Sequence, residues 1–110
     1  MKISGVPFTV TDWDRIPAVE HPGETGTSRW RTVETGPLRA RVVDYSPGYR
    51  ADHWCPRGHV LWVIEGGLTV ELKDGGLHSL EKGMSFQSGD DDLNPHLAYT
   101  ETGATVFIVD

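Results

Sequence analysis

The sequence predicts an all-β fold, and three observations support this. Segments in which apolar and polar residues alternate recur at a spacing of roughly ten residues, as in sandwiches and barrels of short strands. Glycine and proline are frequent, with 13 and 7 residues among 110, and many lie between these segments, where turns are expected. No intervening stretch has the periodicity of the helices that an α/β fold would need. A chain of 110 residues is expected to form one domain, 1–110.

The expected elements follow in chain order. Residues 1–26 are read as an N-terminal arm with one or two short edge strands, because prolines interrupt them. The best helix candidate, 12–18, stops at Pro17 after about one turn. Residues 27–110 are expected to form the body, with Gly66-Gly67 as a tight turn that lets 68–73 pair back on 59–65. The expected strands of the body are 28–34, 38–45, 51–55, 59–65, 68–73, 77–80, 84–88, 96–100 and 104–109.

Two of these strands are apolar on both faces. Residues 60–64 and 105–109 lack the alternation expected of a strand with one solvated face. Their outer faces are therefore predicted to be covered by the N-terminal arm or by a second subunit. We accordingly expect a homodimer, with Trp62, Phe107 or their neighbours in the shared sheet or beneath the arm.

Charge and cysteine content narrow the function and the location. Ten Lys and Arg against sixteen Asp and Glu give a net charge of −6, which argues against nucleic acid as a main partner. No apolar stretch reaches the length of about 18 residues that a membrane span needs, so no membrane partner is expected. The N-terminus lacks the apolar run of a secretory signal. The single cysteine excludes an intrachain disulfide and suits a reducing compartment, so the cytoplasm is the expected location.

The residues that carry chemistry lie in the second half of the chain. His53 and Cys55 are two positions apart, so on a strand both side chains point to one face. His59 opens the next strand after a short turn and can face that pair, and His96 opens a later strand. Imidazole nitrogen and thiolate sulfur converging from neighbouring strands suit a transition metal. The alternative is structural, with hydrogen-bonded histidines and with Cys55 as a small buried apolar residue.

This segment resembles the cupins, whose first motif is commonly written G(x)5HxH(x)3-4E(x)6G. Gly48 precedes His53-Trp54-Cys55, His59 follows after three residues, and Gly66 after six more. The resemblance implies a single antiparallel β-barrel, a double-stranded β-helix of the jelly-roll type. The chain looks more closely like the small cupins named for a motif of Asp, His, Cys and Trp (the DHCW group). That likeness rests on the segments 21–26, 45–55, 59–66, 83–85 and 107–110.

Two substitutions separate this chain from the general cupin pattern. Cys55 stands at the position of the second histidine and His59 at that of the glutamate. His96 lies two residues beyond the place that the second motif implies. The implied ligand set is His53, Cys55, His59 and His96, which still offers three imidazoles and one anion. The thiolate favours Zn²⁺ or Fe²⁺ over Mg²⁺ or Mn²⁺.

Three kinds of function are compatible with such a site. The first is a metal-dependent enzyme of the oxygenase, isomerase or lyase type that acts on a small molecule. The second is a non-catalytic module that binds a small ligand or a metal. The third is a metal-free structural cupin that works through its dimer. Fold alone does not choose among them, since one fold hosts many functions.

Other polar residues are assigned to the surface or to structural roles. Arg29, Arg31, Arg39 and Arg41 are expected to lie on a solvated face beside acidic neighbours; the alternative is a patch that binds carboxylates or phosphates. His78 is expected at the surface and His21 in a structural role in the arm. The acidic run 90–92 is expected to be a surface loop near the mouth of the pocket.

Overall fold

The computed structural model describes residues 2–90 and 95–110, and the regular structure within them is almost entirely β. One 3-10 turn, η1 (Trp13–Arg15), lies in the N-terminal arm, where the helix candidate was placed. None of the described residues forms a helix long and apolar enough to cross a membrane. The strands are β1 (Val19–Pro22), β2 (Thr27–Thr35), β3 (Leu38–Tyr45), β4 (His59–Leu72), β5 (Leu77–Glu81), β6 (Ser85–Ser88), β7 (His96–Tyr99) and β8 (Ala104–Val109).

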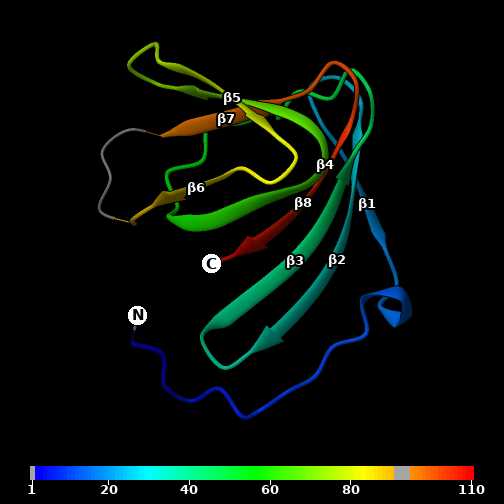
Figure 1. Cartoon of the computed structure of the whole chain (residues 1–110), viewed down its shortest axis with the longest axis vertical. Helices are drawn as coiled ribbons and strands as arrows, with labels where there is room; N and C mark the ends of the chain where they lie inside the picture. Colours follow the sequence, from blue (N-terminus) through cyan, green and yellow to red (C-terminus); the bar gives the residue numbers. More distant parts are fainter. Residues whose placement is uncertain (1, 91–94) are drawn as a thin grey trace.

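The strands form an antiparallel sheet in the order β1-β2-β3-β8-β4-β5, and β6 and β7 also pair with β4 (Figure 1). The long strand β4 is shared by two parts of the sheet. Its first half pairs with β6 and β8, and its second half pairs with β5 and β7. Isolated bridges tie Arg50 to Thr25 and to Tyr99. Within the described residues, continuous strand pairing does not close the sheet into a barrel.

The all-β antiparallel prediction is confirmed, with two corrections. The expected strand 51–55 is absent from the described structure, where only Cys55 forms an isolated bridge. The predicted hairpin at Gly66-Gly67 is wrong, because β4 runs through both glycines as one strand of 14 residues. The pairing with β8 shifts register between Val63 and Glu65, so this part of β4 contains an irregularity and not a turn.

Gly66 is needed for close approach of two backbones. Its φ is +77°, and a Cβ built there would lie 2.2 Å from the carbonyl oxygen of Gly103. A side chain therefore meets both the left-handed backbone region and a backbone clash. Glycine pairs mark tight turns and bulges alike, so the local sequence alone could not separate the two.

We expect Gly66→Ala to destabilise the fold by about 1–2 kcal/mol more than Gly48→Ala, because overpacking adds to the backbone strain. Gly48 is a matched control: its φ is +79°, and a Cβ there has nothing within 4 Å. Urea unfolding of both variants measures the difference. Equal losses would show that the Gly103 backbone moves aside without cost.

The core lies on the inner face of the sheet, between the two halves of β4 and the strands β3 and β8. Alternate residues point inward, as the sequence pattern predicts. Leu61 and Val63 face Ile108 and Val106 across the β4–β8 pairing. The buried cluster is Val43, Leu61, Val63, Leu68, Val70, Leu80, Ala104, Val106 and Ile108.

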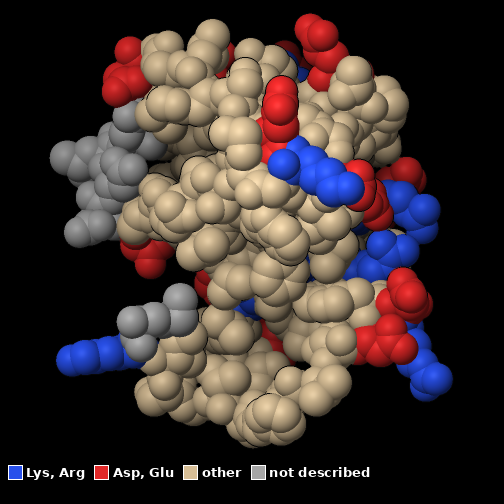
Figure 2. All heavy atoms as spheres, in the orientation of Figure 1, with Lys and Arg blue, Asp and Glu red and all other residues tan. Residues whose placement is uncertain are grey.

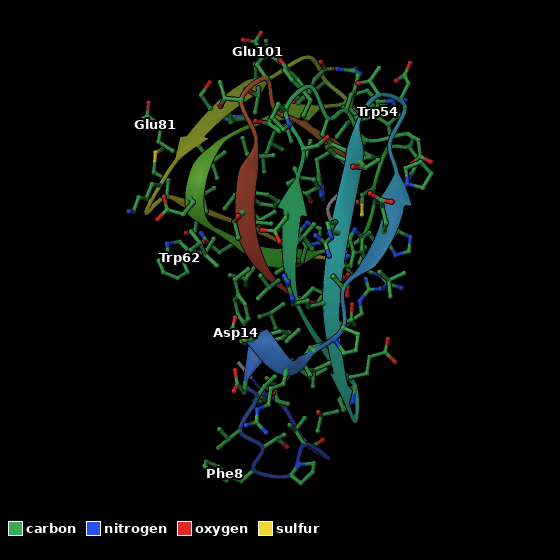
Figure 3. The ribbon with its side chains drawn as sticks, turned by 90° about the vertical axis from the view of Figure 1, so that its right-hand side faces the viewer. Phe8, Asp14, Trp54, Trp62, Glu81 and Glu101 are labelled. Atoms are coloured by element: carbon green, nitrogen blue, oxygen red, sulfur yellow. The ribbon has the colours of Figure 1, made fainter. Side chains whose placement is uncertain are left out.

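The outer face of the same strands is only partly covered. Trp13 of the arm packs edge-on against Phe107, with ring centroids 5.9 Å apart. Trp62 faces outward beside Phe107 in the register but keeps 47% of its surface exposed, and it projects away from the ribbon in Figure 3. The arm thus covers part of β8 and leaves the outer face of β4 open.

Candidate metal centre

Three of the four residues proposed as ligands come together at one end of the sheet. One donor atom from each of Cys55, His59 and His96 can be chosen so that all three lie within 4.8 Å of one another. They come from separate segments: a loop before β4, the first residue of β4 and the first residue of β7. The grouping depends on tertiary structure and not on a local loop.

Backbone hydrogen bonds hold Cys55 and His96 opposite each other. The Cys55 N–H donates to the His96 carbonyl at 2.8 Å, and the His96 N–H donates to the Cys55 carbonyl at 3.0 Å. Residues paired in this way project their side chains to the same face. His59 begins the pairing of β4 with Ser88 of β6, and the turn before it is anchored by a 2.7 Å bond from the Gly58 N–H to Asp90 Oδ1.

The imidazole of His59 is buried without a hydrogen-bond partner. Its side chain is 7% exposed, and neither Nδ1 nor Nε2 has a partner among the described residues. Burial, followed by the charges of His96 and other neighbours, lowers the pKa of His59 to about 4. The ring is therefore neutral at neutral pH, the form that binds metals. A buried imidazole with both nitrogens unsatisfied is costly, and coordination would satisfy one of them.

The donor set fits a borderline transition metal. One thiolate and two imidazoles are ligands that Zn²⁺ accepts, and three protein ligands leave one tetrahedral position open. Ideal Zn–S and Zn–N bonds would hold the donor atoms about 3.3–3.6 Å apart. The observed 4.8 Å limit is wider, so ligation would need small side-chain rotations. Phe86 lies against both rings, with centroids 5.4 Å from His59 and 5.3 Å from His96.

His53 lies outside this group. Its side chain is 74% exposed, and Nδ1 pairs with Asp52 Oδ1 at 2.7 Å. The hydrogen bond to His53 is the main cause that lowers the pKa of Asp52. His53 still lines the cavity beside Cys55, His59 and His96. The structure thus brings together Cys55, His59 and His96 and places His53 at the rim.

Cys55, His59 and His96 line a small cavity of about 110 Å³. Its polar groups, apart from the histidines and Cys55, are Arg41, Tyr45 and Tyr49. The described residues that line it include no carboxylate and no lysine. The remaining lining residues are apolar: Trp30, Ala51, Leu61, Phe86, Leu97, Ala98 and Ile108.

A buried arginine–aspartate cluster adjoins the site, and the sequence analysis did not anticipate it. Arg39 donates to both oxygens of Asp110, from Nε at 2.9 Å and from Nη2 at 2.7 Å. Arg41 Nη2 donates to Asp110 Oδ2 at 3.3 Å. The Asp110 side chain is 1% exposed, and the same oxygen lies 4.0 Å from His59 Nδ1. Burial acts to raise the pKa of Asp110, but the Arg39 hydrogen bond and the Arg41 charge outweigh it and hold that pKa below its usual range.

The register of β2 with β3 separates the four arginines into two pairs. Arg29 and Arg31 share a face with Asp44, whereas Arg39 and Arg41 lie on the opposite face with Trp30 and Val43. The expectation of a solvated face is wrong for Arg41, which is 6% exposed. The missed signal was parity: Arg41 is two residues from Val43, so both point to the core side.

The Asp110 cluster also borders a surface groove of about 580 Å³ whose lining includes Arg39, Arg57 and Asp90. Figure 2 shows the surface hollowed near the C-terminus, with basic and acidic atoms inside the hollow. The candidate metal centre is therefore close to solvent on the side where Asp110 lies next to His59.

The other residues discussed from the sequence are His78, His21 and the acidic run 90–92. His78 is exposed, as expected. His21 stacks on Trp30 with ring centroids 4.3 Å apart, in line with a structural role. In the acidic run only Asp90 is described, and 91–92 lie outside the described residues.

Comparison with solved structures shows the cupin fold. An RmlC-like cupin from Shewanella frigidimarina superposes with a TM-score of 0.75 at 20% identity, covering 96% of this chain and 91% of that chain. A sugar phosphate isomerase of the cupin superfamily from Silicibacter pomeroyi gives 0.68 at 18%, covering 92% and 74%. Fe(II)-HppE, solved with an alternative substrate, gives 0.73 at 17%, covering 94% of this chain and 60% of that chain. No protein-family model matches the chain, and no curated protein has a matching sequence.

Proposed function

We propose that this chain is a small cupin that holds one Zn²⁺ or Fe²⁺ through Cys55, His59 and His96 and binds a small molecule at the open metal position. The proposal rests on the buried ring nitrogens of His59, which have no hydrogen-bond partner among residues 2–90 and 95–110. The grouped donors of Cys55 and His96 support it, as does the iron named for the HppE neighbour. His53 is proposed as a rim residue with access to the same cavity.

The described residues define what the protein would contribute. Cys55, His59 and His96 would hold the metal, and a bound metal supplies Lewis acidity or a site for dioxygen. Asp110 Oδ2 lies 4.0 Å from His59 Nδ1, so a small rotation of the ring would let Asp110 accept a hydrogen bond and orient Nε2 toward the metal. Phe86 and Leu61 would exclude water on the apolar side of the cavity. This donor set suits an oxygenase, isomerase or lyase, and equally a non-catalytic binding module.

Metal content tests this proposal. Protein purified without an affinity tag or chelator, and then reconstituted with Zn²⁺ or Fe²⁺, is expected to hold about one equivalent per chain. Retention below a tenth of an equivalent with both metals would contradict the metal centre and favour a structural cupin. Where metal is retained, oxygen uptake in a small-molecule screen separates an oxygenase from a binding module.

We also propose finer assignments that extend the observed fold. The segment around Arg50 would complete a cupin barrel, since its bridges link Thr25, between β1 and β2, to Tyr99 at the end of β7. Residues 1–110 would form one domain, with 1–26 as arm and 27–110 as barrel, in the DHCW group of cupins. A cytoplasmic location is proposed on the free thiol of Cys55.

The open face of β4 supports a homodimer. Val60 and Trp62 keep 37% and 47% of their surfaces exposed on this face, which the arm covers only in part. Light scattering at micromolar concentration is expected to give about twice the 12.2 kDa chain mass, and Trp62→Glu is expected to reduce it to the monomer. Leu77→Glu on β5, also an exposed apolar position, should leave the dimer intact. A monomeric wild-type protein would show that the arm alone protects these strands.

A further inference from the structure

The cavity beside the metal ligands has a size and a lining that limit its ligand. Its volume is about 110 Å³. A water molecule occupies about 30 Å³ in the liquid, and a cavity of about 150 Å³ holds benzene with its six heavy atoms, so roughly four to five heavy atoms fit here. The strand registers align Arg41, Ile108, Leu61 and Phe86 in one row of the lining, so the apolar end at Phe86 and Leu61 lies opposite Arg41.

Arg41 is buried with part of its hydrogen-bonding capacity unused. Its residue is 6% exposed, and its Nε has no partner among the described residues. The guanidinium carbon lies 4.6 Å from the centre of the Trp30 ring, which holds the side chain in place. Only Nη2 reaches Asp110, at 3.3 Å. A buried charged group with an unsatisfied N–H is unfavourable unless a ligand completes it.

The charges around Arg41 do not balance. Asp110 is shared by two guanidiniums, and Arg39 takes both of its oxygens at shorter distances. Glu34 lies opposite Arg39 in the β2–β3 register, and its negative charge acts on the Arg39 guanidinium. It therefore offsets the positive charge of Arg39 and not that of Arg41. Arg57 adds a further positive group 3.8 Å from Asp110. Burial, and then the charge of Arg39, lower the pKa of Arg41, in accord with a poorly compensated cation.

We propose that this cavity binds a small aliphatic monocarboxylate, with its carboxylate shared by Arg41 and the open metal position and its short tail against Phe86 and Leu61. This inference rests on the proposed metal centre. A divalent metal with one thiolate retains a positive charge, which adds to that of Arg41 and favours an anion. The planar fork of arginine matches a carboxylate, and the apolar wall favours a carbon tail over inorganic phosphate.

The wild-type protein alone gives the first test. In NMR titrations of Zn²⁺-loaded protein, propionate is expected to bind at least about tenfold more tightly than propionamide, its neutral analogue of similar shape, because charge-assisted hydrogen bonds are the stronger ones. Inorganic phosphate is the third probe. Equal binding of propionate and propionamide, or tighter binding of phosphate than of propionate, would overturn the inference.

Variants of Arg41 test whether its guanidinium is responsible for propionate binding. Arg41→Gln is expected to weaken propionate binding about tenfold or more with unchanged zinc content, and Arg41→Lys to recover only part of it, since lysine lacks the fork. Arg39 still pairs with Asp110 in both variants, so both should fold. Arg29→Gln, on the opposite face, is the control that should change nothing. Unchanged propionate affinity in Arg41→Gln would refute the role of Arg41.

The design separates failure of the inference from failure of the metal centre. Wild-type protein that retains zinc but does not favour propionate would contradict the carboxylate inference only. Protein that retains no zinc would contradict the proposed function, and the titrations are then run on metal-free protein. Arg41-dependent binding of propionate there would uphold the Arg41 part of the inference, and its absence would reject the whole.

Discussion

Cys55→Ser is expected to lower the affinity for Zn²⁺ by more than about 100-fold while leaving the free energy of unfolding of the metal-free protein nearly unchanged. Loss of a residue that only supports a ligand weakens metal binding about 10–100-fold, so loss of the one anionic ligand should exceed that range. Serine is close in size to cysteine but is a poor ligand for a borderline metal. Cys55 is half-buried, so the substitution leaves no large cavity. Competition with a chelator of known affinity measures the first effect and urea unfolding the second.

Alkylation gives an independent measure on the wild-type protein. The thiolate is the form that binds metal, and coordination should protect it, so iodoacetamide should react faster after chelator treatment. A buried structural cysteine would react at the same rate with and without metal. Equal rates together with unchanged zinc affinity in Cys55→Ser would remove Cys55 from the site.

Histidine variants separate ligands from neighbours. His59→Ala and His96→Ala should lose zinc as Cys55→Ser does, because both donor nitrogens belong to the group within 4.8 Å. His53→Ala should change zinc affinity less than about tenfold, since its ring is largely exposed and paired with Asp52. His78→Ala, an exposed histidine on β5, is the matched control. A loss for His53→Ala equal to that for His59→Ala would restore the four-ligand site implied by the cupin resemblance.

Period-two patterning was sufficient to predict most of the sheet. The strands β2, β3 and β8 lie within a residue of their expected bounds, because one buried face imposes strict alternation. The glycine pair in β4 was misread, since the contact that requires Gly66 comes from Gly103, far along the chain. Local sequence does not contain that information.

The candidate site was predictable as a list of donors but not as a geometry. His96 reaches Cys55 through a backbone pair that joins residues 41 positions apart in sequence, and no spacing rule fixes that register. Asp110 was missed for the same reason, since it pairs with Arg39 across 71 residues. Arg41 could have been placed correctly from its parity with Val43. Because arginine is usually exposed to solvent, the sequence alone favoured a surface position for Arg41.

Asp110→Asn is expected to destabilise the protein by about 3–5 kcal/mol, the range for removing one partner of a buried ion pair. The Asp110 side chain is 1% exposed, and the substitution leaves Arg39 and Arg41 without their shared carboxylate. Urea unfolding of metal-free protein measures the loss without a contribution from the metal centre. Most domains are stable by about 5–15 kcal/mol, so the variant should remain folded enough to measure.

Asp44→Asn provides the matched control for this prediction. Asp44 also pairs with an arginine of the sheet, Arg31 at 3.2 Å, but it lies on the other face and its side chain is 41% exposed. Solvent screens such pairs, so the expected loss is about 1 kcal/mol or less. The two carboxylates thus differ in burial and in the number of arginines that donate to them, two for Asp110 and one for Asp44. A loss for Asp110→Asn no larger than that for Asp44→Asn would mean that water or rearrangement compensates the buried arginines. Arg41 would then be free to turn toward solvent, and the cavity beside Cys55, His59 and His96 would lose the fixed positive charge on which the proposed carboxylate binding depends.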